Sequence, residues 1–194
     1  MMRYSKINSM DISNGENIGV AIFVQGCHFH CKGCFNQETW DFNGGKEWNK
    51  EVEKQFIELI SKPYIKRVSI LGGEPLADEN LDLTMRIVNI VRKYKFDIPI
   101  WIYTGYTFEK IIKDFNREAD NYYENIIDKT PLLERIEIKR YCIILKCQYL
   151  VDGQFEIDKQ DLTYSKVKYA GSTNQRIIDI IATMNNKGEI VLYE

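Results

Sequence analysis

The chain has only two histidines and four prolines among its 194 residues, and it has no marked excess of charge of either sign. Lys and Arg number 26 against 28 Asp and Glu, so the net charge of -2 gives no electrostatic support for nucleic-acid binding. No uninterrupted apolar run approaches the roughly 20 residues that span a membrane, and the N-terminus leads into no apolar signal segment. We therefore expect a cytoplasmic protein without a nucleic-acid or membrane partner.

Cysteine is present in an odd number, five, which does not indicate a disulfide framework. Three of the five, Cys27, Cys31 and Cys34, form a C-x3-C-x2-C pattern that lets one loop offer three thiolates to one inorganic centre. A structural zinc site or an ordinary [4Fe-4S] cluster takes four protein ligands. A centre held by these three cysteines would therefore keep one position open, as catalytic metals do. Taken alone, the loop also permits zinc with His28 or His30 as fourth ligand.

Apolar runs typical of strands alternate with helical patterns along the chain, which predicts an α/β fold with a parallel sheet and helices outside. A complete (β/α)8 barrel typically needs about 250 residues, so we expect one domain, 1–194, that forms a partial, open, TIM-like barrel. The segment 116–140 is crowded with charge and is interpreted as a helical insertion, either a solvated face or a partner contact. Strands are expected at 19–24, 67–71, 98–103, 142–151 and 189–193, and helices at 49–61, 108–115 and around residues 83–94.

Polar, glycine-bearing segments follow three of these strands. Gly72-Gly73-Glu74-Pro75 follows the second, Thr104-Gly105-Tyr106 the third and Asp152-Gly153 the fourth. Since the carboxyl ends of parallel strands meet at one edge of a sheet, these segments should gather beside the cysteine loop. Cys142 and Cys147 are five apart on an expected strand, so their side chains should point to opposite faces and share no metal.

Six blocks, in order along nearly the whole chain, resemble the radical S-adenosylmethionine superfamily. Within it they are most similar to the family of activating proteins of anaerobic ribonucleoside-triphosphate reductases. That superfamily usually has an aromatic residue just before the third cysteine; here Gly33 fills that position and Phe35 follows, as in this family. The blocks are 11–15, 33–36 with Thr39-Trp40, 72–75, 101–106, 151–155 and 171–176.

The resemblance implies a [4Fe-4S] cluster on Cys27, Cys31 and Cys34, with S-adenosylmethionine chelating the fourth iron. One electron, from a flavodoxin or a ferredoxin-like protein, would cleave S-adenosylmethionine into methionine and a 5'-deoxyadenosyl radical. That radical would take a hydrogen atom from a glycine of the partner, the large subunit of the anaerobic reductase, and leave a glycyl radical. The cofactors carry the chemistry, and the protein positions them.

The same resemblance assigns the cosubstrate contacts. Gly72 and Gly73 would allow close backbone approach, and Glu74 would accept hydrogen bonds from the methionine ammonium. The nucleoside would lie near Gly33, Cys34 and Phe35. Thr104 and Asp152 are expected as further polar contacts, although Asp152-Gly153 also fits a simple turn.

Other functions remain open at this point. An activase of the pyruvate formate-lyase type is disfavoured by Gly33 and by the short chain. A radical enzyme acting on a small molecule, as in deazaguanine synthesis, also fits the motifs. A metal-binding interaction module without catalysis is disfavoured by Glu74-Pro75 and the glycine blocks.

Overall fold

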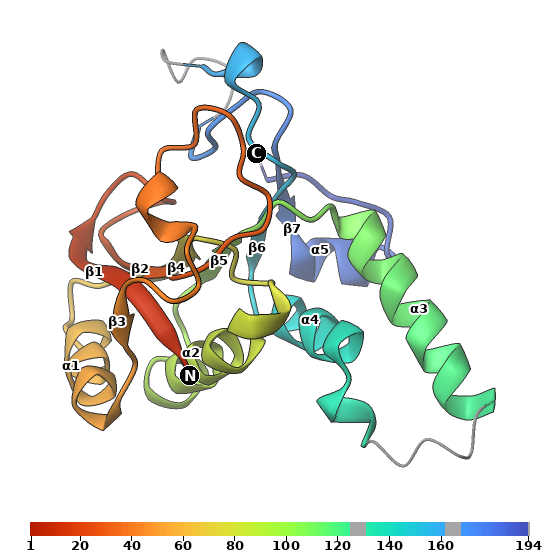
Figure 1. Ribbon diagram of the computed structural model, residues 1–194, viewed down its shortest axis with the longest axis horizontal. Helices are drawn as coiled ribbons and strands as arrows, with labels where there is room; N and C mark the ends of the chain where they lie inside the picture. The colour runs from red at the N-terminus through yellow and green to blue at the C-terminus, as the bar shows by residue number, and fades with distance from the viewer. Residues whose placement is uncertain (125–130, 162–167, 194) are drawn as a thin grey trace.

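The computed structural model describes residues 1–124, 131–161 and 168–193. Its centre is one seven-stranded sheet with strand order β3-β1-β2-β4-β5-β6-β7. Helices α1, α2 and α4 lie on one side of the strands, and the long loops rise on the other (Figure 1). The strands are β1 (Arg3–Asp11), β2 (Gly19–Val24), β3 (Lys46–Glu47), β4 (Arg67–Gly72), β5 (Ile100–Tyr103), β6 (Tyr149–Asp152) and β7 (Arg176–Asp179). The α-helices are α1 (Lys50–Ile60), α2 (Leu81–Tyr94), α3 (Phe108–Glu124), α4 (Ile136–Leu145) and α5 (Ile180–Asn185).

The four central strands, β2, β4, β5 and β6, are parallel, whereas β1, β3 and β7 pair antiparallel at the two edges. The edge strands β3 and β7 do not pair with each other in the described part of the chain, so the sheet is open. This confirms the expected α/β class with an open sheet that is parallel at its centre. The antiparallel β1 was not expected. Its connection to β2, residues 12–18, is too short for the crossover that a parallel neighbour requires.

The two faces of the sheet differ in chemistry, because alternate residues of a strand point to opposite sides. We call the side covered by the helices the helix face and the other side the cavity face. The helix face packs against Phe56 of α1 and Ile87 of α2 in one apolar cluster. The central strands contribute eight fully buried aliphatic side chains to this cluster: Val20, Ile22, Val24, Val68, Ile70, Ile100, Ile102 and Leu150. The cavity face carries Phe23, Arg67, Ser69, Leu71, Trp101, Tyr103 and Val151.

The first two helices form where their sequence patterns predict them. The side chain of Asn49 caps α1 by accepting from the N–H groups of Glu51 and Val52, both at 3.0 Å. In α2, the expected apolar stripe is buried except at Tyr94, the last helical residue, which is 46% exposed. Among the described residues, no helix is both long and apolar enough to cross a membrane.

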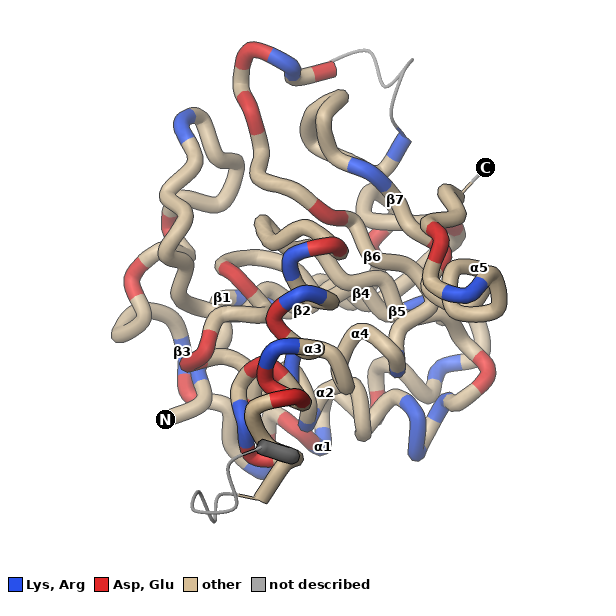
Figure 2. Tube along the Cα trace, turned by 90° about the vertical axis from the view of Figure 1, so that its right-hand side faces the viewer, with Lys and Arg blue, Asp and Glu red and all other residues tan. Residues whose placement is uncertain are grey.

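The segment 116–140 is helical in both of its described parts. The helix expected at 108–115 continues to Glu124, and the end of the segment forms the first half of α4. Residues 125–130 lie outside the described part. Helix α4 packs against α2 and α3, so this segment contributes to the helical layer. Figure 2 shows basic and acidic positions interspersed along these helices.

The prediction of a strand at 142–151 is wrong for residues 142–148. Cys142 lies in α4, and β6 begins only at Tyr149. A short run of aliphatic residues such as CIIL does not distinguish a buried helix from a buried strand. Cys147 follows the helix, is buried, and donates from its thiol to the carbonyl of Ile143 at 3.3 Å. The expected strand at 189–193 is reduced to one isolated bridge between Leu192 and Ile178.

Candidate functional site

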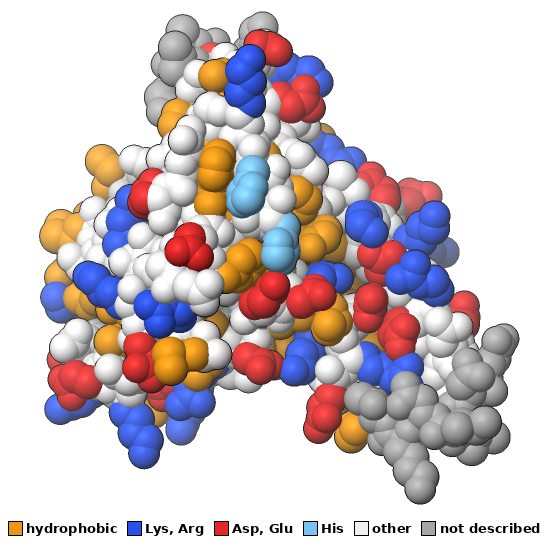
Figure 3. Space-filling view, viewed as in Figure 1, with side chains coloured by type: hydrophobic (Ala, Val, Ile, Leu, Met, Phe, Trp, Pro, Cys, Tyr) orange, Lys and Arg blue, Asp and Glu red, His pale blue; other side chains and the backbone are white. Residues whose placement is uncertain are grey.

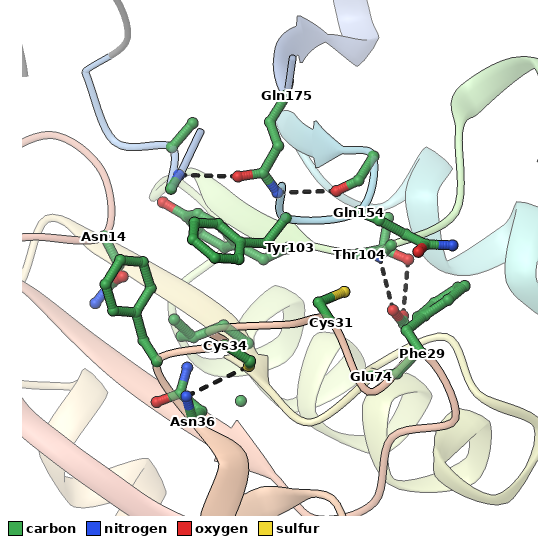
Figure 4. Close-up of a pocket in the computed structure, with 18 of the residues that line it drawn as sticks. Asn14, Phe29, Cys31, Cys34, Asn36, Glu74, Tyr103, Thr104, Gln154 and Gln175 are labelled. Atoms are coloured by element: carbon green, nitrogen blue, oxygen red, sulfur yellow. Dashed lines mark hydrogen bonds between the residues drawn. The ribbon is translucent and has the colours of Figure 1, made fainter. Parts of the chain in front are cut away.

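A cavity of about 660 Å³ opens above the carboxyl ends of the central strands. This volume lies in the range of small-molecule sites. Loops after β2, β4, β5 and β6 all contribute to its walls, as expected from the strand-end segments. In Figure 4, Cys31 and Cys34 lie between Asn36 on one side and Glu74 with Thr104 on the other. The lining includes Cys27, Cys31, Cys34, Phe35, Gly72, Gly73, Glu74, Thr104 and Gly153.

The cysteine loop is fixed by its own backbone. The N–H groups of Gly26 and Cys27 donate to the carbonyls of Thr39 and Trp40, at 2.7 and 3.0 Å, so the returning chain closes the loop. The N–H of Asn36 donates to the Cys34 sulfur at 3.4 Å. These contacts direct three thiols of one loop into the same cavity.

Burial is the main cause that raises the pKa values of the Cys27 and Cys31 thiols. Main-chain N–H groups of Phe29 and Phe155 oppose that effect at Cys27 and Cys31 respectively. Metal coordination deprotonates thiols outright, so raised pKa values do not prevent ligation. Hydrogen bonds to the sulfurs would tune the potential of a bound cluster.

The donor set fits an iron-sulfur cluster better than a single ion. No group of three His, Cys, Asp or Glu side chains in the described ranges is arranged to hold one metal ion. Zinc would need all its ligands within about 2.3 Å of one point, whereas a cubane binds each thiolate through a different iron.

The two histidines do not complete a zinc site with the cysteines. Neither lines the cavity, and both are exposed on one face of the molecule (Figure 3). The His28 ring is 3.0 Å from the Glu79 carboxylate, and the His30 ring lies 4.7 Å from the Trp40 ring. Their partners thus hold both rings at the surface.

Glu74 is a buried carboxylate at one end of the cavity, only 2% exposed. Its Oε1 accepts from the Leu76 N–H at 2.8 Å and from the Thr104 hydroxyl at 2.7 Å, and its Oε2 accepts from the Gly105 N–H at 2.7 Å. Burial nevertheless raises the pKa of Glu74 to about 7. Since an ionised carboxylate offers about four acceptor positions, one remains on Oε2 for a donor in the cavity.

Gly72 and Gly73 are required by contacts within the protein. Gly72 has a φ of +111°, and a Cβ there would lie 2.7 Å from the Cα of Phe23. A Cβ on Gly73 would lie 2.2 Å from the carbonyl oxygen of Gly26, directly before the first cysteine. From the sequence, these glycines are expected to allow close approach of a ligand; in the structure, β2 approaches Gly72 and the cysteine loop approaches Gly73.

The remaining predicted site residues divide into two groups. Phe35 and Thr104 line the cavity, and the Phe35 ring lies 5.1 Å from that of Phe155. Gly33 and Asp152 do not line it. Gly33 faces Ile157, whose Cδ1 would lie 2.4 Å from an added Cβ.

Asp152 has structural partners. Its carboxylate accepts from the Phe108 N–H at 2.9 Å and from both the Nε and an Nη of Arg176. These contacts join the end of β6 to the start of α3 and to β7, and they support a structural role.

A buried ion pair below the cavity was not foreseen from the sequence. Arg67 is fully buried and donates to the Asp11 carboxylate at 2.5 Å and to the Ser69 hydroxyl at 2.6 Å. Ser69 donates in turn to the carbonyl of Asn14, which lines the cavity. The pair therefore holds the 11–15 block against the sheet. The 11–15 block is one of the six sequence signals, whereas the sequence gives Arg67 no role beyond the expected strand at 67–71.

The Gly171–Gln175 block closes the opposite wall. The Gln175 side chain accepts from the Gly171 N–H and donates to the Gly153 carbonyl, both at 2.8 Å (Figure 4). One amide thus joins two of the six blocks at the cavity.

Comparison with known proteins agrees with this site. A family model described as a 4Fe-4S single cluster domain matches residues 13–178, which defines the class of protein. Relatives named anaerobic ribonucleoside-triphosphate reductase-activating protein share similarity over nearly the whole chain. The protein from Pasteurella multocida (strain Pm70) is 30% identical over 178 residues, 91% of this chain and 96% of that protein. The one from Vibrio cholerae (strain ATCC 39315 / El Tor Inaba N16961) is 31% identical over 178 residues, 91% and 97% of the two chains. The one from Escherichia coli (strain K12) is 29% identical over 176 residues, 90% and 96%.

The chain belongs to the family of anaerobic ribonucleoside-triphosphate reductase-activating proteins. The resemblance inferred from the six blocks is thereby confirmed.

Proposed function

We propose that this protein activates an anaerobic ribonucleoside-triphosphate reductase by reductive cleavage of S-adenosylmethionine at a [4Fe-4S] cluster. Cys27, Cys31 and Cys34 would hold the cluster. When bound, the cluster supplies the electron, and S-adenosylmethionine supplies the 5'-deoxyadenosyl radical that takes hydrogen from a glycine of the reductase large subunit. The observation that carries this proposal is the convergence of three thiols and the Gly72–Glu74 turn on one cavity.

The proposal includes the finer fold and setting expected from the sequence. We assign the open sheet to the partial (β/α) barrel of the radical S-adenosylmethionine type, as one domain. The protein would act in the cytoplasm and receive its electron from a flavodoxin or a ferredoxin-like protein.

The chain's own residues have separate tasks in this reaction. The free acceptor position on Oε2 of Glu74 would bind the ammonium of S-adenosylmethionine, while Thr104 fixes the orientation of that carboxylate. Phe35, whose ring is tilted by 54° against that of Phe155, offers an aromatic surface for the nucleoside. The three cysteine thiolates would bind the iron of the cluster.

The rim of the cavity supports a protein substrate. Ile12 and Phe35 line the cavity and yet are 73% and 63% exposed. A primary radical in a site open to water would be quenched, so another surface must cover it. A glycine-bearing loop of the reductase would cover these apolar side chains as it enters.

The test uses anaerobically reconstituted protein, a reductant, S-adenosylmethionine and the large subunit of an anaerobic reductase from the same organism. We expect about four irons and four sulfides per chain, and a glycyl radical doublet in electron paramagnetic resonance, together with methionine and 5'-deoxyadenosine. Replacing the partner's glycine by alanine should remove the doublet, and Cys31→Ala should remove both the doublet and the products.

Two outcomes would contradict the proposal. Stoichiometric zinc without sulfide after anaerobic reconstitution would refute the cluster. Turnover of a small molecule, with no doublet from a competent reductase, would instead identify a radical enzyme of the small-molecule type.

A further inference from the structure

Arg140 lies in α4, at the end of the charged segment 116–140. Its side chain is charged, yet the residue is only 8% exposed. Buried arginines are uncommon unless their donors are paired. Its partners are Leu76, Asp78 and Tyr106, which lie in the two segments that also carry Glu74 and Thr104 of the cavity wall.

The guanidinium first holds the turn that carries Glu74. Its Nε donates to the carbonyl of Leu76 at 2.8 Å, and an Nη pairs with the carboxylate of Asp78. Leu76 is the same residue whose N–H donates to Glu74. Arg140 therefore holds the residue whose N–H orients this carboxylate.

The guanidinium also contacts the second segment that supports Glu74. It lies over the Tyr106 ring, 4.8 Å from the ring centre. The Tyr106 N–H donates to the Thr104 hydroxyl, which donates to Glu74. The Tyr106 ring packs edge-on against the Phe29 ring, with 5.1 Å between the ring centres. Phe29 lies between Cys27 and Cys31 in the sequence.

The positive charge of Arg140 also favours the ionised form of Glu74. It is the cation whose field lowers the pKa of Glu74, against the larger effect of burial. The carboxylate thus keeps more of its negative charge toward the cavity. A ligand that presents a primary ammonium there gains from that charge, whereas the nucleoside part of the same ligand does not.

We propose that Arg140 is a positioning residue for the ammonium end of S-adenosylmethionine, acting through the 74–78 turn and Tyr106. This inference rests on the proposed function, because it assumes that S-adenosylmethionine is the ligand. It assigns a role in the site to α4, a helix that lines no part of the cavity.

The test compares Arg140→Met, which removes the charge and the donors, with Arg140→Lys, which keeps the charge but lacks the planar guanidinium that reaches Leu76 and Asp78 together. Lys139→Met is the matched control, because Lys139 is the neighbouring residue and pairs with Asp82 away from the cavity. Affinity is measured for S-adenosylmethionine and for 5'-methylthioadenosine, which lacks the amino-acid end. Iron content and melting temperature are measured for each variant.

Arg140→Met should weaken S-adenosylmethionine binding about tenfold, in keeping with loss of charge-assisted contacts. Binding of 5'-methylthioadenosine should stay within about twofold of wild type, a difference too small to reflect a lost contact of that kind. Arg140→Lys should fall between wild type and Arg140→Met for S-adenosylmethionine, and Lys139→Met should match wild type. Iron content should be unchanged in all of them.

Equal loss of affinity for both ligands would show a general structural role and overturn the inference. Unchanged affinity for S-adenosylmethionine in Arg140→Met would also overturn it, and would leave the proposed function intact. A wild-type protein that holds its cluster and binds no S-adenosylmethionine would overturn both.

Discussion

The two faces of the sheet are formed by the same strands but differ in the side chains that they carry. On β5, Ile100 and Ile102 enter the aliphatic cluster under the helices, whereas Trp101 and Tyr103 point to the cavity face. Among the central strands, the helix face carries a charged side chain only at the end of β6, where Asp152 is buried, whereas the cavity face has the buried Arg67. The largest apolar cluster therefore lies on the helix face, whereas the cavity face combines smaller apolar clusters with specifically placed polar groups.

Paired cysteine variants should give the largest contrast between the faces. Cys31→Ala should abolish cluster binding and activity, because two thiolates remain where the proposed cluster needs three. Cys147→Ala changes a buried cysteine of the helix-face cluster and should leave iron content unchanged, at a cost of about 1 kcal/mol in stability. Iron and sulfide analysis after anaerobic reconstitution measures this, and loss of iron in Cys147→Ala would break the comparison.

Breaking the buried ion pair should cost more stability than trimming the helix face. Arg67→Met leaves the Asp11 carboxylate buried without its partner, for an expected loss of about 3–5 kcal/mol. Ile70→Val removes one methylene from the helix face and should cost about 1 kcal/mol. Denaturant unfolding gives both values, and similar losses in the two variants would contradict the distinction.

Glu74 should make the stability of the ligand-free protein depend on pH. Its pKa is about 7 when folded, against an ordinary 4.5, so the folded state binds more protons between those values. Stability should therefore fall as pH rises from about 5 to 7, by about 3 kcal/mol at most, and then level off. Unfolding of wild type and Glu74→Gln at each pH isolates this effect; parallel curves would refute it.

Gly73→Ala should affect the cysteine loop as well as the ligand turn. The added methyl collides with the Gly26 carbonyl, so we expect a loss of about 1–3 kcal/mol and lower iron content. Gly188→Ala is the control, because its methyl meets no atom within 4 Å. The only expected loss of stability there comes from the backbone strain of an alanine at a φ of +87°. Normal iron content in Gly73→Ala would show that the loop yields without losing the cluster.

Local patterns predicted the parts of the molecule that depend on neighbouring residues. Periodicity and turn chemistry predict strands β2 and β4, the capped helix α1 and the polar strand ends. The partners of Arg67 and Arg140 could not be predicted, because they lie 56 and 64 residues away in sequence. The second half of α4 was missed because its aliphatic run fits either kind of buried element.

The contact between Gly26 and Gly73 also limits how the site can move. The Gly73 N–H donates to the Val24 carbonyl at 3.0 Å, and the Glu74 N–H donates to the Gly26 carbonyl at 2.8 Å. With no side chain between the two backbones, the cysteine loop and the Glu74 turn form one rigid body. Rearrangement when a partner arrives would therefore fall on the rim at Ile12 and Phe35, and the relative placement of iron ligands and cosubstrate ligands would survive docking unchanged.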